Sequence, residues 1–302
     1  MSTQEALKQV QEQILDFVKE LGHQDSATIY SKLEHGKMLR SKLILKIAGA
    51  TQEAVTLCAV VEMIHLASLL HDDVIDNADT RRGKASINAL FGEHTAIMFG
   101  DILYSKAFTE LTKFDSKVAH TIANAVTELS IGELLDVRLS ESFNTNKDAY
   151  FDMIYKKTSS LIEAAAGAAA LLVGRDKEKF AIYGRNLGIA FQIVDDLLDI
   201  LQDEATLGKP AMSDLREGKV TLPYLYLWED NENQREYIES RFKVSLGNAQ
   251  SEALRDKLIK TGAIDKSKAY IQSCVNEALE AIKDENIPEL AEIVQAMTQR
   301  EY

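Results

Sequence analysis

The 302-residue sequence contains little proline, little cysteine and less positive than negative charge. Its three prolines are Pro210, Pro223 and Pro288, so none occurs before residue 210. Because proline breaks helices and marks turns, this scarcity favours long packed helices over strands and tight turns. Two cysteines, Cys58 and Cys274, are too few for a disulfide framework and indicate a reducing compartment.

The net charge of −13 argues against nucleic acid as a partner, because its phosphates need a basic footprint that the chain lacks overall. The sequence does not open with the charged and apolar regions of a signal peptide, so we expect a cytoplasmic protein. The longest uninterrupted small and apolar stretch, residues 164–174, is shorter than the roughly 20 residues that span a bilayer. We therefore expect no transmembrane segment.

Apolar residues recur with helical spacing along most of the chain. The first helix is predicted after Ser2, which forms a capping-box pattern with Glu5, and its apolar positions are Leu7, Val10, Ile14, Phe17 and Leu21. Similar periodicity predicts helices over residues 39–50, 53–76, 93–113, 118–139, 147–173, 178–202, 222–228, 234–244, 249–262 and 264–284. No linker composition divides them, so the sequence predicts an all-α fold with residues 1–302 in a single domain, one large helical bundle.

Two copies of the pattern DDxxD lie inside apolar helical runs: residues 72–76 and residues 195–199. Residues four apart stack on one helix face, so Asp72 lies over Asp76 and Asp195 over Asp199. Such carboxylates repel one another unless a cation lies between them. The alternative is a pair of solvated acidic helix ends, which the duplication and the apolar flanks make the weaker interpretation.

The two motifs contain six carboxylates: Asp72, Asp73, Asp76, Asp195, Asp196 and Asp199. With no cysteine or clustered histidine beside them, they suit a hard cation such as Mg²⁺, which proteins hold with a few carboxylates plus substrate phosphates. We therefore expect a phosphate-bearing ligand.

Basic residues follow both motifs and also occur at two other places. The stretch 77–88 contains Arg81, Arg82 and Lys84, and the stretch 203–223 contains Lys209 and Lys219. Further candidates for a diphosphate are Lys37 and Arg40 at a predicted helix start, and Lys157 and Thr158 before an alanine-rich run. Plain solvated surface is the alternative for each cluster, and for His65 and His71 it is a core histidine bonded to backbone.

These motifs together resemble those of the trans-isoprenyl (polyprenyl) diphosphate synthases over nearly the whole length. The resemblance rests on residues 71–76 with Arg81-Arg82-Gly83-Lys84, on Phe91-Gly92 through Gly100-Asp101, and on residues 188–199. It continues through Lys209-Pro210 to Asp214, Gly218-Lys219 and Thr221-Leu222-Pro223. It implies the isoprenoid synthase fold, an all-α bundle around a central cavity. The implied reaction joins an allylic diphosphate to isopentenyl diphosphate, head to tail, with loss of diphosphate.

The resemblance also implies roles for individual residues. Asp72, Asp76 and Asp195, supported by Asp73, Asp196 and Asp199, would hold about three Mg²⁺ ions on the allylic diphosphate, which favours C–O ionisation. Arg81, Lys157, Lys209 and Lys219 would grip that diphosphate, with Thr158 and Gln192 near the developing cation. Lys37, Arg40, His65 and Arg82 would bind isopentenyl diphosphate. A homodimer and transient membrane contact at product release are further implications.

The chain departs from the common family pattern at Ser41, where proline is usual, and at Met212, where glycine is usual. Both changes spare the charged groups, so we expect altered local geometry without loss of activity.

Product length is predicted from Ala67 and Ser68, about one helical turn before Asp72. In family members that make short products, an aromatic residue at this turn resembles a floor of the tunnel. The resemblance therefore implies that small residues here leave the tunnel open. An open tunnel favours a long product of about six to nine isoprene units, with octaprenyl as the central expectation. Such a product suits a respiratory quinone. Close helix packing by small residues is the alternative, and the residue that stops elongation is not identified.

Three other functions compete with this interpretation. A shorter-chain farnesyl or geranylgeranyl diphosphate synthase would share the motifs. An HD-type phosphohydrolase would use His65, His71 and Asp72, but the second DDxxD argues against it. A regulatory subunit of the same fold is expected to lose carboxylates or cations, and this chain keeps both sets.

Overall fold

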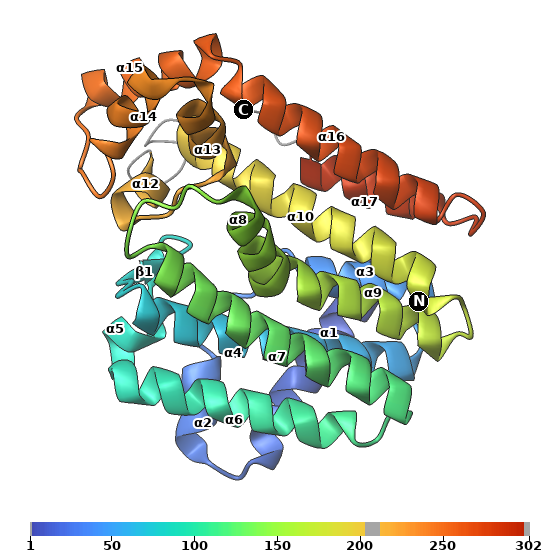
Figure 1. The fold of residues 1–302 in the computed structure, drawn as a ribbon. Coiled ribbons are helices and arrows are strands. Elements are labelled where there is room, and N and C mark those ends of the chain that lie inside the picture. The colour runs from blue at the N-terminus through green and yellow to red at the C-terminus, as the bar shows by residue number, and fades with distance from the viewer. Residues whose placement is uncertain (1, 203–211, 299–302) are drawn as a thin grey trace. The chain divides into compact units, whose positions relative to one another are not determined.

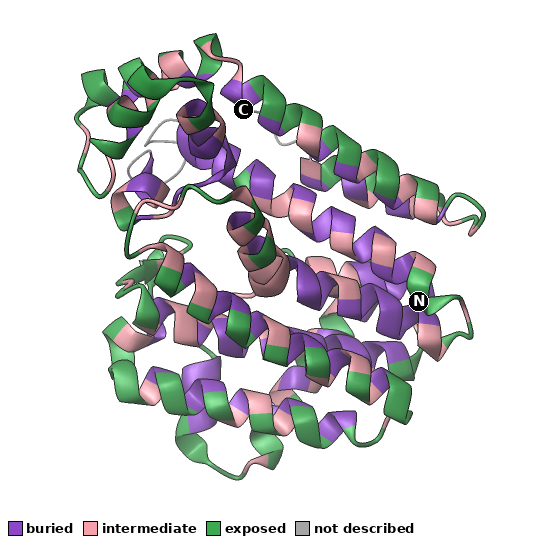
Figure 2. Ribbon diagram, in the orientation of Figure 1, coloured by how far each residue is buried: buried purple, intermediate pink, exposed green. Residues whose placement is uncertain are grey.

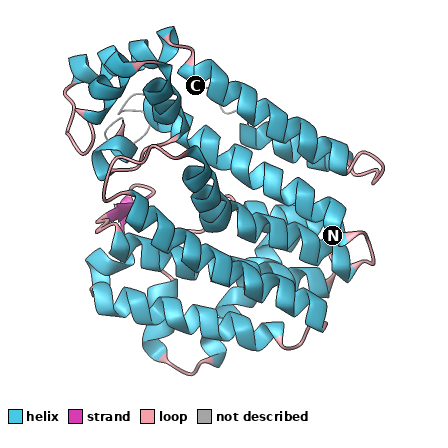
Figure 3. Cartoon of the chain, viewed as in Figure 1, coloured by secondary structure: helices cyan, strands magenta, loops and turns pink. Residues whose placement is uncertain are grey.

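The computed structural model describes residues 2–202 and 212–298, and these residues are almost entirely helical (Figures 1 and 3). The predicted all-α class is confirmed. The chain forms two compact units, the first comprising Met1–Val126 with Ala164–Ala181 and the second Thr127–Glu163 with Ile182–Tyr302. Three helices, α7, α9 and α10, contain residues of both units.

The first unit is organised around α4. Its helices up to residue 111 are α1 (Thr3–Glu20), α2 (Gln24–Tyr30), α3 (Leu39–Ala48), α4 (Gln52–Ile75), α5 (Ile87–Phe91) and α6 (Glu93–Leu111). The predicted capping box is confirmed: Ser2 Oγ accepts from Glu5 N at 3.2 Å, and Ser2 N donates to Glu5 Oε2 at 2.7 Å. Helix α4 packs against α1, α3 and α6, and its burial explains why so few polar residues interrupt it.

Helix α4 is also long and apolar enough to cross a membrane by length and composition. Isolated polar residues such as Glu62 divide its apolar run, so α4 contains no long uninterrupted apolar stretch. In the structure 78% of its most hydrophobic window is buried by protein, as in the core helix of a globular unit.

A two-stranded hairpin follows α4 in the stretch 77–88, where no regular structure was predicted. Strands β1 (Thr80–Arg81) and β2 (Lys84–Ala85) pair antiparallel, with Arg81 opposite Lys84. The two turn residues, Arg82 and Gly83, have φ of 52° and 76°. Positive φ at both positions matches the twist of a two-residue hairpin, so this turn fixes where the adjacent cations lie.

The remaining helices are α7 (Ser116–Leu139), α8 (Lys147–Ile154), α9 (Ser160–Leu172), α10 (Lys177–Leu201), α12 (Ser213–Glu217), α13 (Leu222–Asp230), α14 (Glu232–Glu239), α15 (Asn248–Lys260), α16 (Ala263–Ala281) and α17 (Pro288–Thr298). The core of the second unit includes Tyr150, Ile193, Leu197, Leu225 and Ile264. Figure 2 shows exposed residues running along α16, whose other positions are buried or intermediate.

The predicted helix over residues 147–173 is interrupted by a π-helical turn, η1 (Tyr155–Ser159). Periodicity did not reveal it, because one wide turn barely changes the apolar spacing. The short helices α2, α5, α12 and α17 also escaped prediction. Helix α14 ends at Glu239, not at residue 244 as predicted, and Lys243 has a positive φ of 58°.

Candidate active site

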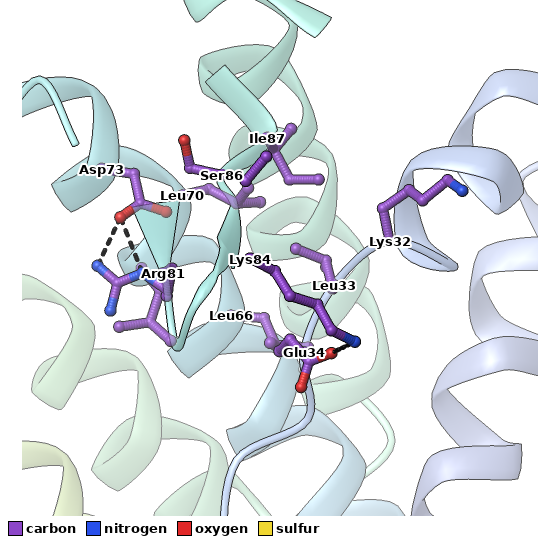
Figure 4. A pocket seen from close by; sticks show the side chains of 12 residues that line it. Lys32, Leu33, Glu34, Leu66, Leu70, Asp73, Arg81, Lys84, Ser86 and Ile87 are labelled. Carbon is purple, nitrogen blue, oxygen red and sulfur yellow. Dashed lines mark hydrogen bonds and ion pairs between the residues drawn. The ribbon is translucent and has the colours of Figure 1, made fainter. Parts of the chain in front are cut away.

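The first DDxxD motif forms the C-terminal end of α4. Asp72 is half-buried, Asp76 is exposed and Asp73 is buried. Asp73 Oδ1 accepts a hydrogen bond from Arg81 Nε at 2.8 Å and lies 2.7 Å from Arg81 Nη2 (Figure 4). Asp73 therefore anchors the hairpin to α4, and Arg81, predicted to grip the allylic diphosphate, contacts a carboxylate in this structure.

The hairpin is also tied to the segment that precedes α3. Arg82 Nη1 donates to the Glu34 carbonyl oxygen at 2.9 Å, and Lys84 forms an ion pair with the Glu34 carboxylate (Figure 4). These contacts hold Arg82 beside the segment that contains Lys37, which is exposed. The hairpin and the segment around Glu34, about 50 residues apart in the sequence, are thereby joined. Neither motif alone indicates this contact.

Arg40, His65, Arg81 and Arg82 interact electrostatically within the first unit. Burial holds the pKa of His65 well below its usual range, and the positive charges of Arg40, Arg82 and Arg81 lower it further. The imidazole is therefore neutral near pH 7. Arg40 Nε is buried without a hydrogen-bond partner among the described residues. Concentrated positive charge of this kind favours a polyanion such as a diphosphate.

Glu62 interacts electrostatically with Arg40 and Arg82 and was not predicted as a site residue. Its Oε1 accepts from Ser41 Oγ at 2.7 Å and from Ser41 N at 3.4 Å. Burial raises the pKa of Glu62, opposed by the bonds from Ser41 and the charge of Arg40. Proline at position 41 would provide neither donor, so the departure at Ser41 has a structural consequence. A lone acid in the apolar run of α4 was the sequence signal that was missed.

The second motif lies near the end of α10, and its three carboxylates differ in burial. Asp195 is exposed, whereas Asp196 and Asp199 are 4% and 2% exposed. Asp196 accepts from Tyr150 Oη at 2.5 Å and from Gln192 Nε2 at 3.0 Å. Burial raises the pKa of Asp196 to about 7, although both hydrogen bonds oppose the shift.

Asp199 bonds to Met212 and to the first two residues of α12. Its Oδ1 accepts from Ser213 Oγ at 2.7 Å, its Oδ2 from Asp214 N at 3.1 Å, and its backbone oxygen from Met212 N at 2.9 Å. Met212 has a φ of 57°, where glycine has no steric cost, and its side chain is 2% exposed. Burial of the thioether offsets the strained backbone at the second departure from the family pattern.

Lys157 and Thr158 lie on η1. Lys157 Nζ donates to Asp136 Oδ2 at 2.5 Å and lies 2.8 Å from Glu133 Oε2, both on α7. A Cβ at Gly132 would clash with the Lys157 backbone, so only glycine lets α7 approach η1 this closely. Glu133 and Asp136 were not predicted as site residues, and the stretch was identified only as an amphipathic helix.

The other predicted residues are placed as follows. Lys209 lies outside the described residues, and Lys219 Nζ is 3.2 Å from Glu217 Oε2. His71 Nε2 is 3.1 Å from the Ile97 carbonyl oxygen, which agrees with the backbone-bonded alternative. Ala67 is fully buried, and Ser68 Oγ donates to the His65 carbonyl oxygen at 2.8 Å.

A pocket between α4 and the hairpin is lined by Leu66, Leu70, Asp73 and Arg81 among others (Figure 4). Its volume of about 30 Å³ holds about one water molecule, so it is too small for an isoprenoid tail. Ala67 does not line it, and the predicted elongation tunnel stays a prediction.

No group of three or more His, Cys, Asp or Glu side chains is arranged to hold a metal ion within residues 2–202 and 212–298. The donors nevertheless fit a hard cation, because the polar side chains that are accessible in the two motifs, Asp72, Asp76 and Asp195, are all carboxylates. A cation held by single carboxylates needs further ligands from its substrate.

Comparisons with known proteins agree with these features. Residues 24–260 match the family model described as Polyprenyl synthetase. Octaprenyl pyrophosphate synthase from Helicobacter pylori has a TM-score of 0.93 and 43% identity, with 99% of this chain and 100% of that chain covered. Octaprenyl diphosphate synthase from Escherichia coli is 34% identical over 82% of this chain and 80% of its own length.

Solanesyl-diphosphate synthase 1 from Oryza sativa is 38% identical over 74% of this chain, and the match spans 52% of that relative's length. A polyprenyl synthase from Caulobacter crescentus, solved with calcium and isoprenyl diphosphate, has a TM-score of 0.88 and 29% identity over 99% of this chain and 96% of its own.

These matches define the class of protein: a prenyltransferase of a family that acts on isoprenoid diphosphates and uses a divalent metal. The chain belongs to the polyprenyl synthetase family. This membership confirms the predicted family and enzyme class and excludes the HD-type phosphohydrolase. The named relatives favour long products.

Proposed function

We propose that the chain is a Mg²⁺-dependent synthase that condenses an allylic diphosphate with isopentenyl diphosphate to give a long all-trans polyprenyl diphosphate. The observation that carries the proposal is that the six motif carboxylates differ in burial. Asp72, Asp76 and Asp195 are half-buried or exposed, whereas the other three are buried. The accessible three are those expected to reach a metal, and the buried three accept hydrogen bonds from Arg81, Tyr150 and Ser213.

Asp72, Asp76 and Asp195 would hold about three Mg²⁺ ions together with the allylic diphosphate. When bound, the ions neutralise negative charge on the leaving diphosphate. Arg81 and Lys157, with Lys209 and Lys219, would bind diphosphate oxygens. Because Arg81 and Lys157 contact carboxylates in this structure, substrate binding exchanges one anionic partner for another, which limits the desolvation cost.

Isopentenyl diphosphate would bind to Lys37, Arg40, His65 and Arg82. The neutral imidazole of His65 can donate one hydrogen bond while the guanidinium groups supply the charge. Thr158 and Gln192 would lie near the allylic cation, and the departing diphosphate would accept the proton lost after carbon–carbon bond formation.

The proposed product has about six to nine isoprene units, since Ala67 and Ser68 carry small side chains at the turn before the first motif. Octaprenyl is the central expectation, as two of the named relatives are octaprenyl synthases. A respiratory quinone is the expected end use, with a shorter farnesyl or geranylgeranyl product as the alternative.

We also propose that residues 1–302 act as one domain and pair as a cytoplasmic homodimer, with membrane contact only at product release. The shared helices α7, α9 and α10 support a single domain. Exposed apolar side chains on α5 and α6 support a dimer: Leu90, Phe91, Ile97, Met98 and Phe108. The retained carboxylates and cations argue against a regulatory subunit.

The test is to incubate the purified protein with Mg²⁺, farnesyl diphosphate and labelled isopentenyl diphosphate, and then measure the chain length of the dephosphorylated products. A ladder ending at about six to nine units supports the proposal. A stop at geranylgeraniol keeps the reaction and refutes the long product. No incorporation, with or without EDTA, refutes the catalytic role.

A further inference from the structure

Four side chains of the second unit form a hydrogen-bonded row, which we name the Asp196 network. Its members are Tyr150 on α8, Thr158 on η1, and Gln192 and Asp196 on α10. Thr158 Oγ1 donates to Gln192 Oε1 at 2.9 Å, Gln192 Nε2 donates to Asp196 Oδ1 at 3.0 Å, and Tyr150 Oη donates to Asp196 Oδ2 at 2.5 Å.

The direction of these bonds follows from the chemistry of the groups. The ionised form of Asp196 only accepts hydrogen bonds, so the Gln192 amide turns its NH₂ toward Asp196 and its oxygen toward Thr158. Thr158 has a single hydroxyl hydrogen, which it then donates to that oxygen. The lone pairs of Thr158 Oγ1 are thereby left for another partner.

Tyr150 stands at the closed end of the network. Its side chain is 1% exposed, and Asp196 is 4% exposed. The hydroxyl donates to one oxygen of the buried carboxylate and Gln192 donates to the other. A buried carboxylate that loses one of its donors is destabilised, and its remaining donors rearrange to compensate. Without Tyr150 Oη, the carboxylate is free to rotate and take Gln192 with it.

We propose that Tyr150 is a positioning residue for the prenyl transfer, which acts through Asp196 and Gln192 to present the oxygen of Thr158 to the allylic cation. The inference rests on the proposed function, since it assumes that Thr158 faces the cation. A preorganised oxygen lowers the free energy of a positive transition state more than that of the neutral substrate, so it acts on kcat more than on KM.

The experiment compares Tyr150→Phe with the wild type at saturating Mg²⁺ and measures kcat and KM for both diphosphates. We expect kcat to fall about tenfold or more, with KM for both substrates changed less than about twofold. Tyr183→Phe is the matched control, because Tyr183 is equally buried and its hydroxyl donates to the Leu290 carbonyl oxygen at 2.8 Å. The control should keep the wild-type kcat.

A double-mutant cycle separates positioning from a general loss of structure. If Tyr150 acts through Thr158, Tyr150→Phe should lower kcat little further in a Thr158→Val background, whereas independent structural damage is additive. Thr158→Ser keeps the hydroxyl and should retain most of the activity.

If Tyr150→Phe does not fold, Asp196→Asn provides the second test. Its amide keeps the volume but has one acceptor oxygen and one NH₂ donor in place of two acceptors, so Tyr150 Oη and Gln192 Nε2 can no longer donate to separate oxygens as in the wild type. The variant should therefore lower kcat without raising KM and be non-additive with Thr158→Val. Two results overturn the positioning role alone, provided that the wild type is active. One is an unchanged kcat in Tyr150→Phe, and the other is additive effects in the double-mutant cycle. A wild type without prenyl transfer overturns both proposals.

Discussion

Replacement of Asp199 by alanine should loosen the start of α12, where Ser213 and Asp214 bond to this carboxylate. The carboxylate accepts from Ser213 Oγ at 2.7 Å and from Asp214 N at 3.1 Å, and it is 2% exposed. A hydrogen bond to a charged group contributes about 1.5–3 kcal/mol, so two such bonds set a loss of about 3–6 kcal/mol in the free energy of unfolding. At roughly 2 °C per kcal/mol for a large domain, Tm should fall by about 6 °C or more.

The isosteric Asp199→Asn should cost less, because the amide oxygen can accept from Asp214 N while the Ser213 hydroxyl rotates to accept from the amide NH₂. The measurement is thermal unfolding together with amide hydrogen exchange at Asp214. Asp195→Ala is the matched control on the same helix, since Asp195 is exposed and its loss should change stability by no more than about 0.5 kcal/mol. Equal Tm values for the Asp199 and Asp195 alanine variants would refute the anchoring role.

Three further predictions concern metal binding, product length and pH. Asp72→Ala or Asp195→Ala should abolish Mg²⁺-dependent condensation with circular dichroism unchanged, and full activity in either variant would reject the metal assignment. Ala67→Phe should shorten the product; unchanged length with a stability loss of about 1–3 kcal/mol would identify Ala67 as a packing residue instead. Burial raises the pKa of Glu62, so the unfolded chain releases this proton first and wild-type stability falls as pH rises above the unfolded value. The Tm of Glu62→Gln relative to wild type should therefore increase from pH 4.5 to pH 8, and a constant difference would contradict the shift.

The long elements were predictable because burial imposes a period. Helix α4 was predicted over residues 53–76 and found at Gln52–Ile75, since an apolar face of such length has few alternatives to a packed helix. The hairpin at residues 80–85 and the π-turn at Tyr155–Ser159 were not predicted, because each depends on a local backbone state that apolar spacing does not report.

The candidate residues could be found, but not their partners. The acidic and basic motifs stand in the sequence as unusual clusters, and their residue types restrict the chemistry to a diphosphate and a hard cation. Glu62, Glu133 and Asp136 each lie inside an ordinary helical pattern. Only their contacts with Ser41 and Lys157, across gaps of about 20 residues, mark them as part of the candidate site.

The sequence by itself determined the helical class, the two carboxylate motifs and the family, because composition, periodicity and motif spacing are local properties of the chain. Only the tertiary structure decided which carboxylates are accessible and which are buried. Asp195 and Asp199 share a motif, yet one is exposed and the other is bonded to Ser213 and Asp214. Whether a side chain is buried depends on which segment packs against its helix face. The sequence of the helix does not specify that segment.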